Sequence, residues 1–277
     1  MRRKTLKHIL VATDGEPRSD MALRVANALA ERDAGFVEIA SVFTPRIAVP
    51  RLSAADPELC CEARDRRAAA EQFSRVWQQV RSRLQLHWPM LFRVGSVPSV
   101  IAELARSGRA DLVVIGRATD CACGARTPRA HTAEQLAIAS DTPTLALPGR
   151  AGDQLPRIAV VALNDSAASH RASQVTRSVL ARHGVVHAAK RAASRELLAL
   201  CDALGAELLA IPIAGDNAVV RSLMGGQAAE VLAKARCAVL ITPSPSEIDQ
   251  TTPEPPLAPA SQLPTRNASV EAAGANA

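Results

Sequence analysis

Residues 7–15 read Lys-His-Ile-Leu-Val-Ala-Thr-Asp-Gly, an apolar run that ends in an Asp-Gly turn signal. Residues 18–33 follow with apolar side chains at helical spacing, and Gly35 separates them from a second apolar run at 36–43. Strands without polar alternation belong to a parallel sheet that is covered on both faces, and strand-helix-strand is its building unit. The stretch therefore predicts an α/β fold.

The same alternation continues through the first half of the chain. The pattern predicts further strands at 90–94, 111–116 and 143–147, with helices at 58–87, from Ser99 to Ala105, and at 131–140. We therefore expect a five-stranded, doubly wound parallel-sheet domain over residues 1–150.

A shorter repeat of this pattern follows. Arg157-Ile-Ala-Val-Val-Ala-Leu repeats the first strand 149 residues later, whereas Ala206-Glu-Leu-Leu-Ala-Ile repeats residues 110–115 only 96 residues later. A loss of 53 residues corresponds to one strand and one long helix. The sequence thus predicts a second, shortened doubly wound domain over 151–243, with about four strands at 157–163, 185–189, 207–213 and 237–242.

The last strand of each copy is expected at a sheet edge, where unpaired backbone groups favour pairing with another strand. We expect Leu145 and Leu147 of one copy to lie beside Leu240 and Ile241 of the other, so that the two domains pair within the chain. Residues 244–277 are rich in proline and lack hydrophobic periodicity, which predicts a disordered tail.

Composition excludes several classes of protein. Aromatic residues are 2% of the 277 residues, too few for the base-stacking surfaces of single-strand nucleic-acid binders. The net charge of +6 is spread as +6 over 1–150, +3 over 151–242 and −3 over 243–277, without a basic stripe. No apolar run has the length of a membrane span, and the N-terminus lacks a signal sequence. We expect a cytoplasmic protein with no nucleic-acid or membrane partner.

The six cysteines do not form a zinc motif. They lie at 60, 61, 121, 123, 201 and 237, with no CxxC and no histidine at ligand spacing. We expect reduced thiols and no metal; a redox or metal role for Cys121 and Cys123 is the alternative.

Ligands of open parallel sheets bind beyond the carboxyl ends of strands, where the strand order reverses. The loops after the first and fourth strands are therefore the candidates. Asp14 could accept hydrogen bonds from an adenine amine or a ribose hydroxyl, and Gly15 would let backbone approach a ligand. The alternative is that Asp14 and Gly15 supply only turn chemistry.

The arrangement resembles the universal stress protein family. The residues that carry the resemblance are the Asp-Gly turn, Ala110-Asp-Leu-Val-Val-Ile-Gly116, and Thr132-Ala-Glu-Gln-Leu-Ala before the Pro143-containing last strand. It covers residues 5–148 and, in reduced form, 156–243. It implies an adenine nucleotide alpha hydrolase-like fold, pairing of two domains as in the dimers of this family, and a regulatory role in the stress response; a further homodimer stays open.

The resemblance also implies a nucleotide site. ATP-binding members have a loop of the form G-x2-G-x9-G-[ST] after the fourth strand, whose amides face the phosphates. Both halves depart from it. In the first half, Thr119 takes the second glycine position and Ala130-His131 take the place of Gly-Ser. In the second half, Gly215 and Gly225 keep the x9 spacing, but Pro212 takes the first glycine position, Gly226 replaces the hydroxyl residue, and the Asp14 equivalent is lost. The expected nucleotide-binding residues are Asp14, Gly15, Val42, Gly116, Arg117, Thr119, His131, Thr132, Gly215, Gly225 and Gly226.

These departures weaken the expected affinity. If Thr119 and Ala130 adopt left-handed conformations, the cost is about 2–4 kcal/mol, or roughly 30- to 1,000-fold in affinity. A substituted loop could instead offer Arg117 or His131 to the phosphates.

No sequence motif of the common nucleotide-dependent enzymes or hydrolases is present: GxxxxGK[ST], GxGxxG and GxSxG are all missing. Asp14 is the one convincing carboxylate near the expected cleft, so we expect no catalysis. The sequence favours a regulator with weak or residual binding of ATP or another adenine nucleotide. The alternatives are a nucleotide-independent protein-interaction scaffold of the same fold and an ATP-cleaving or adenylyl-transferring enzyme.

Overall fold

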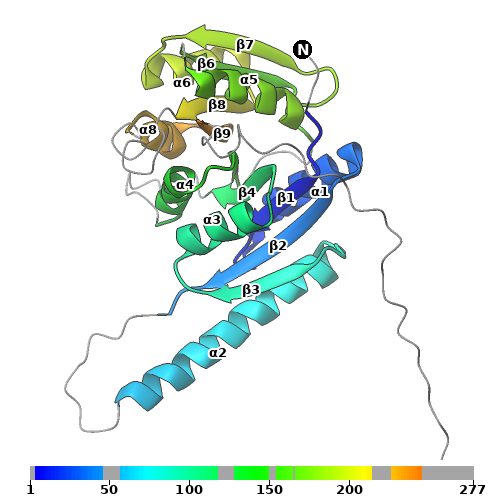
Figure 1. Cartoon of the computed structure of the whole chain (residues 1–277), viewed down its shortest axis with the longest axis vertical. Helices are drawn as coiled ribbons and strands as arrows, with labels where there is room; N and C mark the ends of the chain where they lie inside the picture. The colour runs from blue at the N-terminus through cyan, green and yellow to red at the C-terminus, as the bar shows by residue number, and fades with distance from the viewer. Residues whose placement is uncertain are drawn as a thin grey trace, which may run out of the picture. The chain divides into compact units, whose positions relative to one another are not determined.

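One mixed, largely parallel sheet of nine strands runs through the protein, in the order β3-β2-β1-β4-β5-β9-β8-β6-β7. The computed structural model describes residues 4–45, 57–117, 128–149, 154–164, 166–213 and 226–244. Figure 1 shows β3 with the long helix α2 at one end of the sheet and β7 at the other. The α/β class is confirmed, and β5 and β9 join the two halves into one continuous sheet, as the expected pairing of the last strands implies.

The strands lie where the apolar runs predicted them, to within one or two residues. The first half contains β1 (His8–Ala12), a 3-10 turn η1 (Pro17–Ser19), α1 (Asp20–Asp33), β2 (Phe36–Phe43), α2 (Pro57–Trp77), a π-helical segment η2 (Gln78–Arg83), β3 (Met90–Val94), α3 (Val97–Ser107), β4 (Leu112–Arg117), α4 (Pro128–Ala139) and β5 (Thr144–Pro148). The second half contains β6 (Ile158–Leu163), α5 (Ala167–Val179), β7 (Val185–Lys190), α6 (Ser194–Leu204), β8 (Leu208–Ile213), α8 (Gly226–Lys234) and β9 (Ala238–Pro243).

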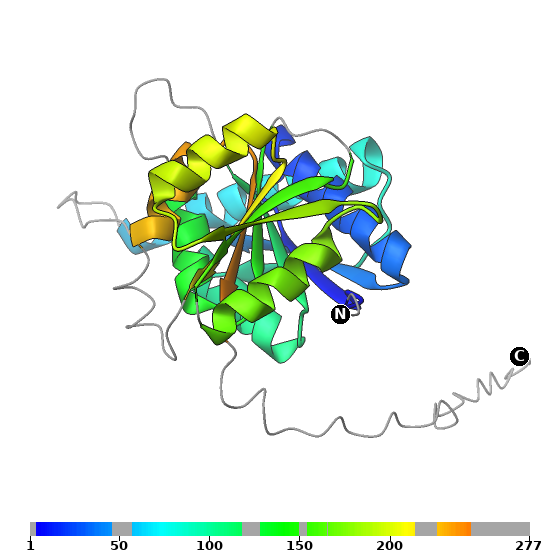
Figure 2. The same ribbon diagram turned by 90° about the horizontal axis from the view of Figure 1, so that it is seen from above.

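Helices cover both faces of the sheet, as the unbroken apolar strands require. Ile9 and Val11 of β1 pack into a core with α1, η2 and α5, whereas Leu10 packs into a second core with α3, α4, α6 and α8. The view from above in Figure 2 shows helices on both sides of the twisted sheet. Among the described residues, no helix combines the length and the apolar character needed to cross a membrane.

The two halves meet at β5 and β9, which pair antiparallel while all other strand pairs are parallel. Leu145 lies opposite Leu240 and Thr144 opposite Ile241, which confirms the predicted pairing of the last strands. Leu147 lies beyond the paired register, although it is buried. The strand order β7-β6-β8-β9 of the second half matches β2-β1-β4-β5 of the first, without a counterpart of β3.

Arginine side chains also cross between the halves. Arg32 of α1 donates from Nη1 to the carbonyl oxygen of Leu180, at the end of α5, at 2.8 Å. In the opposite direction, Arg171 of α5 donates to the carbonyl oxygen of Asp141 at 3.0 Å. Since helix ends expose carbonyl groups that lack partners, these contacts stabilise one half through the other.

Candidate functional site

A pocket lies at the carboxyl ends of β1 and β4, the adjacent strands from which the chain turns to opposite sides of the sheet. Its volume is about 130 Å³. Residues from β1, β2, β4, α3, α4 and the loop after β1 line it. Four of the predicted binding residues, Asp14, Val42, Gly116 and Thr132, lie around this one pocket.

The walls of the pocket are mostly apolar. Val42, Val97, Ile101, Ile115 and Leu136 supply branched aliphatic side chains. Such a surface suits the flat face of a ring system, which gains from burial but needs few polar partners. The pocket therefore favours a planar, weakly polar group.

Asp14 is the only ionisable side chain among the described residues that line the pocket. Its Oδ1 accepts a hydrogen bond from the backbone N–H of Glu16 at 3.2 Å, which forms an Asx turn and orients the carboxylate. Asp14 therefore both forms the turn and lines the pocket. A carboxylate held in this way can accept hydrogen bonds from hydroxyl or amine groups of a ligand.

Gly15 faces the other side of the loop. Its φ of 83° lies in the region that favours glycine, and a Cβ atom there would lie 2.8 Å from both the Arg75 Cβ and the Val76 nitrogen of α2. The structure therefore corrects the expectation that Gly15 admits a ligand: the missing side chain makes room for a helix.

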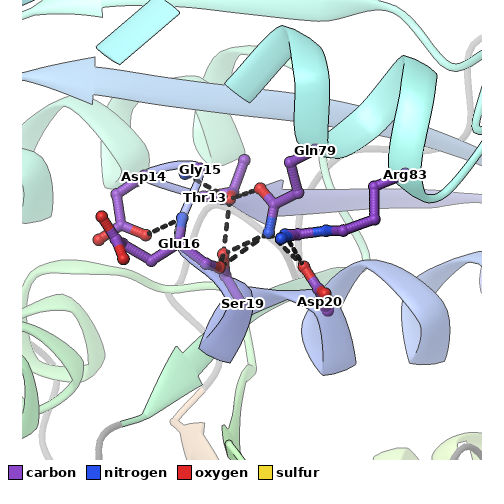
Figure 3. Close-up of polar contacts among 8 residues, drawn as sticks. All are labelled: Thr13, Asp14, Gly15, Glu16, Ser19, Asp20, Gln79 and Arg83. Atoms are coloured by element: carbon purple, nitrogen blue, oxygen red, sulfur yellow. Dashed lines mark hydrogen bonds and ion pairs between the residues drawn. The ribbon is translucent and has the colours of Figure 1, made fainter. Parts of the chain in front are cut away.

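A buried polar network holds this loop in place (Figure 3). Thr13 Oγ1 accepts from the Gly15 N–H at 3.1 Å and donates to Gln79 Oε1 at 2.7 Å. Gln79 Nε2 donates to the Glu16 carbonyl oxygen at 2.9 Å and to Asp20 Oδ1 at 2.6 Å. The Gln79 side chain, which is 2% exposed, thus fixes the backbone on which Asp14 sits.

Sequence reasoning missed Gln79, which lies in the π-helical segment η2. A signal was present, because Val76, Gln79 and Val80 have the spacing of a buried helical stripe, and an amide on such a stripe needs buried partners. Arg83, one turn further on, donates to Asp20 Oδ1 at 2.5 Å and closes the network at its exposed end.

Arg117 does not reach the pocket, which corrects its prediction as a phosphate ligand. It is fully buried and donates to the carbonyl oxygens of Leu232, Ala235 and Cys237, the last two at 2.8 Å. Its guanidinium thus covers the C-terminal end of α8 in the other half. Burial lowers the pKa of Arg117 to about 10, so the side chain remains charged at neutral pH.

The other predicted residues lie outside this pocket. His131 belongs to α4 and Gly226 begins α8; the His131 side chain, with Thr119, Gly215 and Gly225, lies outside the described residues. In the second half, Asn164 follows β6 as Asp14 follows β1, but its Oδ1 already accepts from the Ser169 hydroxyl at 2.5 Å. Among the residues that the structure describes, no charged side chain takes the place of Asp14 in that loop.

Comparison with known proteins supports the family suggested by the sequence. The universal stress protein family model matches residues 5–148. A universal stress protein of solved structure from Archaeoglobus fulgidus is 14% identical, with 86% of this chain and 98% of that chain covered and a TM-score of 0.63.

Two further solved structures match this chain in part. A functionally unknown protein from Pseudomonas aeruginosa PAO1 is 12% identical over 86% of this chain and 93% of its own, with a TM-score of 0.50. A universal stress protein in complex with cAMP, 20% identical, matches 53% of this chain and 100% of its own with a TM-score of 0.34. No curated protein shows a significant match. The chain belongs to the universal stress protein family.

Proposed function

We propose that this protein is a regulator that binds an adenine nucleotide, with the base and the ribose held in the pocket between β1 and β4. The observation that carries the proposal is the meeting of Asp14, Val42, Gly116 and Thr132 around one pocket at the reversal of the strand order. The adenine nucleotide as ligand class rests on the resemblance to the ATP-binding members of the family.

The size of the pocket supports recognition of a part of the nucleotide. Its volume of about 130 Å³ is well below the roughly 300–1,000 Å³ of sites that bury a whole small molecule. A base between Val42 and Ile101, with Asp14 accepting from an amine or hydroxyl group, fits both the volume and the chemistry.

Phosphate contributes little to binding in this proposal. No arginine, lysine or histidine lines the pocket among the described residues, and Arg117 is engaged with α8. Affinity should therefore depend weakly on the number of phosphates. We propose binding without catalysis, since phosphoryl transfer requires a placed base and carboxylates for a metal ion, and Asp14 is the one carboxylate among the described residues that line the pocket.

Thermal unfolding with ATP, AMP, cAMP and GTP tests the proposal. A ligand at 100 times its Kd stabilises by about 2.7 kcal/mol, which raises Tm by roughly 5–10 °C for a unit of this size. We expect comparable shifts with ATP and AMP, and smaller shifts with GTP.

Two variants and one control locate the site. Asp14→Ala removes the acceptor and Val42→Phe fills the pocket, so both should lose the nucleotide-induced shift. Glu103→Ala removes an exposed carboxylate of α3 and should keep it. An unchanged Tm of the wild-type protein at millimolar adenine nucleotide would contradict the proposal and favour the interaction scaffold.

A further inference from the structure

Two cysteines of the second half lie together beside the junction of the halves. Cys201 belongs to α6, and Cys237 lies between α8 and β9. Both line a cavity of about 840 Å³, formed by the ends of α6 and α8 and the end of β5. Their side chains interact, because each thiol shifts the pKa of the other. Cys201 is buried, whereas Cys237 is partly exposed.

Arg117 places a buried positive charge beside this pair. Its Nη2 donates to the Cys237 carbonyl oxygen at 2.8 Å, while its Nε–H has no acceptor among the described residues. Among the described residues, Cys237 is the ionisable side chain that opposes the effect of burial on the pKa of this guanidinium. Since a buried charge is costly without a counterion, this site favours an anion at Cys237.

The surroundings therefore make the two thiols differ in reactivity. The hydrogen bond from Cys201, and next the charge of Arg117, lower the pKa of Cys237 against the opposing effect of burial. The same hydrogen bond, and next burial, raise the pKa of Cys201. The thiolate is the nucleophilic form of cysteine, so Cys237 is the reactive member and Cys201 stays protonated.

We propose that Cys201 and Cys237 form an oxidisable pair, in which the Cys237 thiolate attacks a hydroperoxide and Cys201 then closes a reversible disulfide. This reaction is independent of nucleotide binding.

The Cys237 thiolate attacks one peroxide oxygen, the O–O bond breaks, and the product is a sulfenic acid with one molecule of alcohol or water, whose oxygen takes up a proton. The Cys201 sulfur then attacks the sulfenic sulfur, an S–S bond forms, and hydroxide leaves as water with the Cys201 proton. The two sulfurs lose two electrons and the peroxide gains them. A dithiol reductant reverses the reaction.

A metal site is a weaker interpretation of the same pair. Structural metal sites for thiolates need three or four ligands. Among the described residues, no group of three histidine, cysteine or acidic side chains could hold a metal ion.

The test uses the full chain with Cys60, Cys61, Cys121 and Cys123 changed to serine, so that only the pair remains. Arg221, Lys234 and Arg236 lie between the two cysteines, so trypsin places them on separate peptides. After treatment with hydrogen peroxide and blocking with iodoacetamide, mass spectrometry should find these two peptides linked, and dithiothreitol should separate them.

Labelling rates and single variants assign the roles. Below pH 8, iodoacetamide should label Cys237 at least about tenfold faster than Cys201, the effect of one pKa unit on the thiolate fraction. In Cys201→Ser, dimedone should trap a sulfenic acid on Cys237; in Cys237→Ser, it should trap none on Cys201.

Three results would overturn the proposal: equal labelling of the two thiols, sulfenic acid formation in Cys237→Ser at the rate seen in Cys201→Ser, or no linked peptide although Cys237 is oxidised. The labelling rates need no substitution of either cysteine, so the proposal stays testable if a variant fails to fold.

Discussion

Leu145 of β5 lies directly opposite Leu240 of β9, and both side chains are fully buried. This pair stands at the point where two sheet edges would otherwise be exposed, and antiparallel pairing satisfies the backbone groups of both. Leu145 and Leu240 also belong to one apolar cluster with side chains of α1 and α5. The two halves therefore share a core as well as a sheet.

A shared core predicts that the halves unfold together. Leu209 of β8 is fully buried in the second half, and Leu209→Ala should destabilise the protein by about 2–5 kcal/mol. Both tryptophans, Trp77 and Trp88, lie in the first half. Tryptophan fluorescence in urea should therefore shift to the same lower midpoint as circular dichroism.

Val185→Ala is the matched control, since it removes apolar atoms from a side chain of β7 that is 52% exposed. It should change stability by less than about 0.5 kcal/mol. A fluorescence midpoint that Leu209→Ala leaves unchanged, with a separate early step in circular dichroism, would show two independent units.

The elements could be predicted from the sequence because the strands are unbroken apolar runs with glycine or proline at their ends. The pairing of last strands was predictable from the need to cover edges. The antiparallel register of this pairing, with Leu145 opposite Leu240 and Leu147 beyond the paired residues, was not predictable, because no local pattern encodes it. The π-helical turn at Gln79 was also missed, since a shift in backbone hydrogen bonding arises from tertiary contacts.

The position of Asp14 and Gly116 around one pocket was predictable, because both lie at or just after the ends of strands at the same edge of the sheet. Arg117 is the residue for which prediction from loop position failed. Side chains of a strand alternate between faces, so Arg117 shares a face with Val113 and Ile115, which pack into the core that contains α8. Its acceptors come from α8, more than 110 residues away in sequence, and proximity to Gly116 was a misleading guide.

Gln79→Leu tests the network beneath the Asp14 loop. The change leaves the Thr13 hydroxyl and the Glu16 carbonyl group without their buried partner, so we expect a loss of about 1–3 kcal/mol in the free energy of unfolding. Gln78→Leu, at the exposed neighbouring position, should have little effect. Urea unfolding of both variants measures the difference, and equal stabilities would contradict a structural role for the Gln79 amide.

Gly15→Ala and Gly205→Ala separate backbone strain from steric overlap. Both glycines have positive φ, 83° and 60°, and each substitution should cost roughly 1–2 kcal/mol for that reason. A Cβ at Gly205 meets nothing within 4 Å, whereas a Cβ at Gly15 meets the backbone of α2 at 2.8 Å. Gly15→Ala should therefore be clearly the more destabilising in urea unfolding, and a reversed order would refute the tight packing of α2 on this loop.

Arg117→Met tests how the first half stabilises α8. Two effects oppose each other: the change removes a buried charge, which is favourable, and it deprives three carbonyl groups of their donor, which is unfavourable. Carbonyl groups at a helix end cannot find new partners inside a core, so the second effect should prevail by roughly 2–4 kcal/mol. Arg106→Met, on the exposed side of α3, is the control for the loss of an arginine.

The same variant has a readout that a packing defect alone would not give. Without the guanidinium, the Cys237 thiolate loses its neighbouring positive charge, so the pKa of Cys237 should rise. Its labelling by iodoacetamide should then require higher pH, whereas Arg106→Met should leave the pH profile unchanged. A profile that stays at the wild-type position in folded Arg117→Met would show that the hydrogen bond from Cys201 alone sets the reactivity of Cys237.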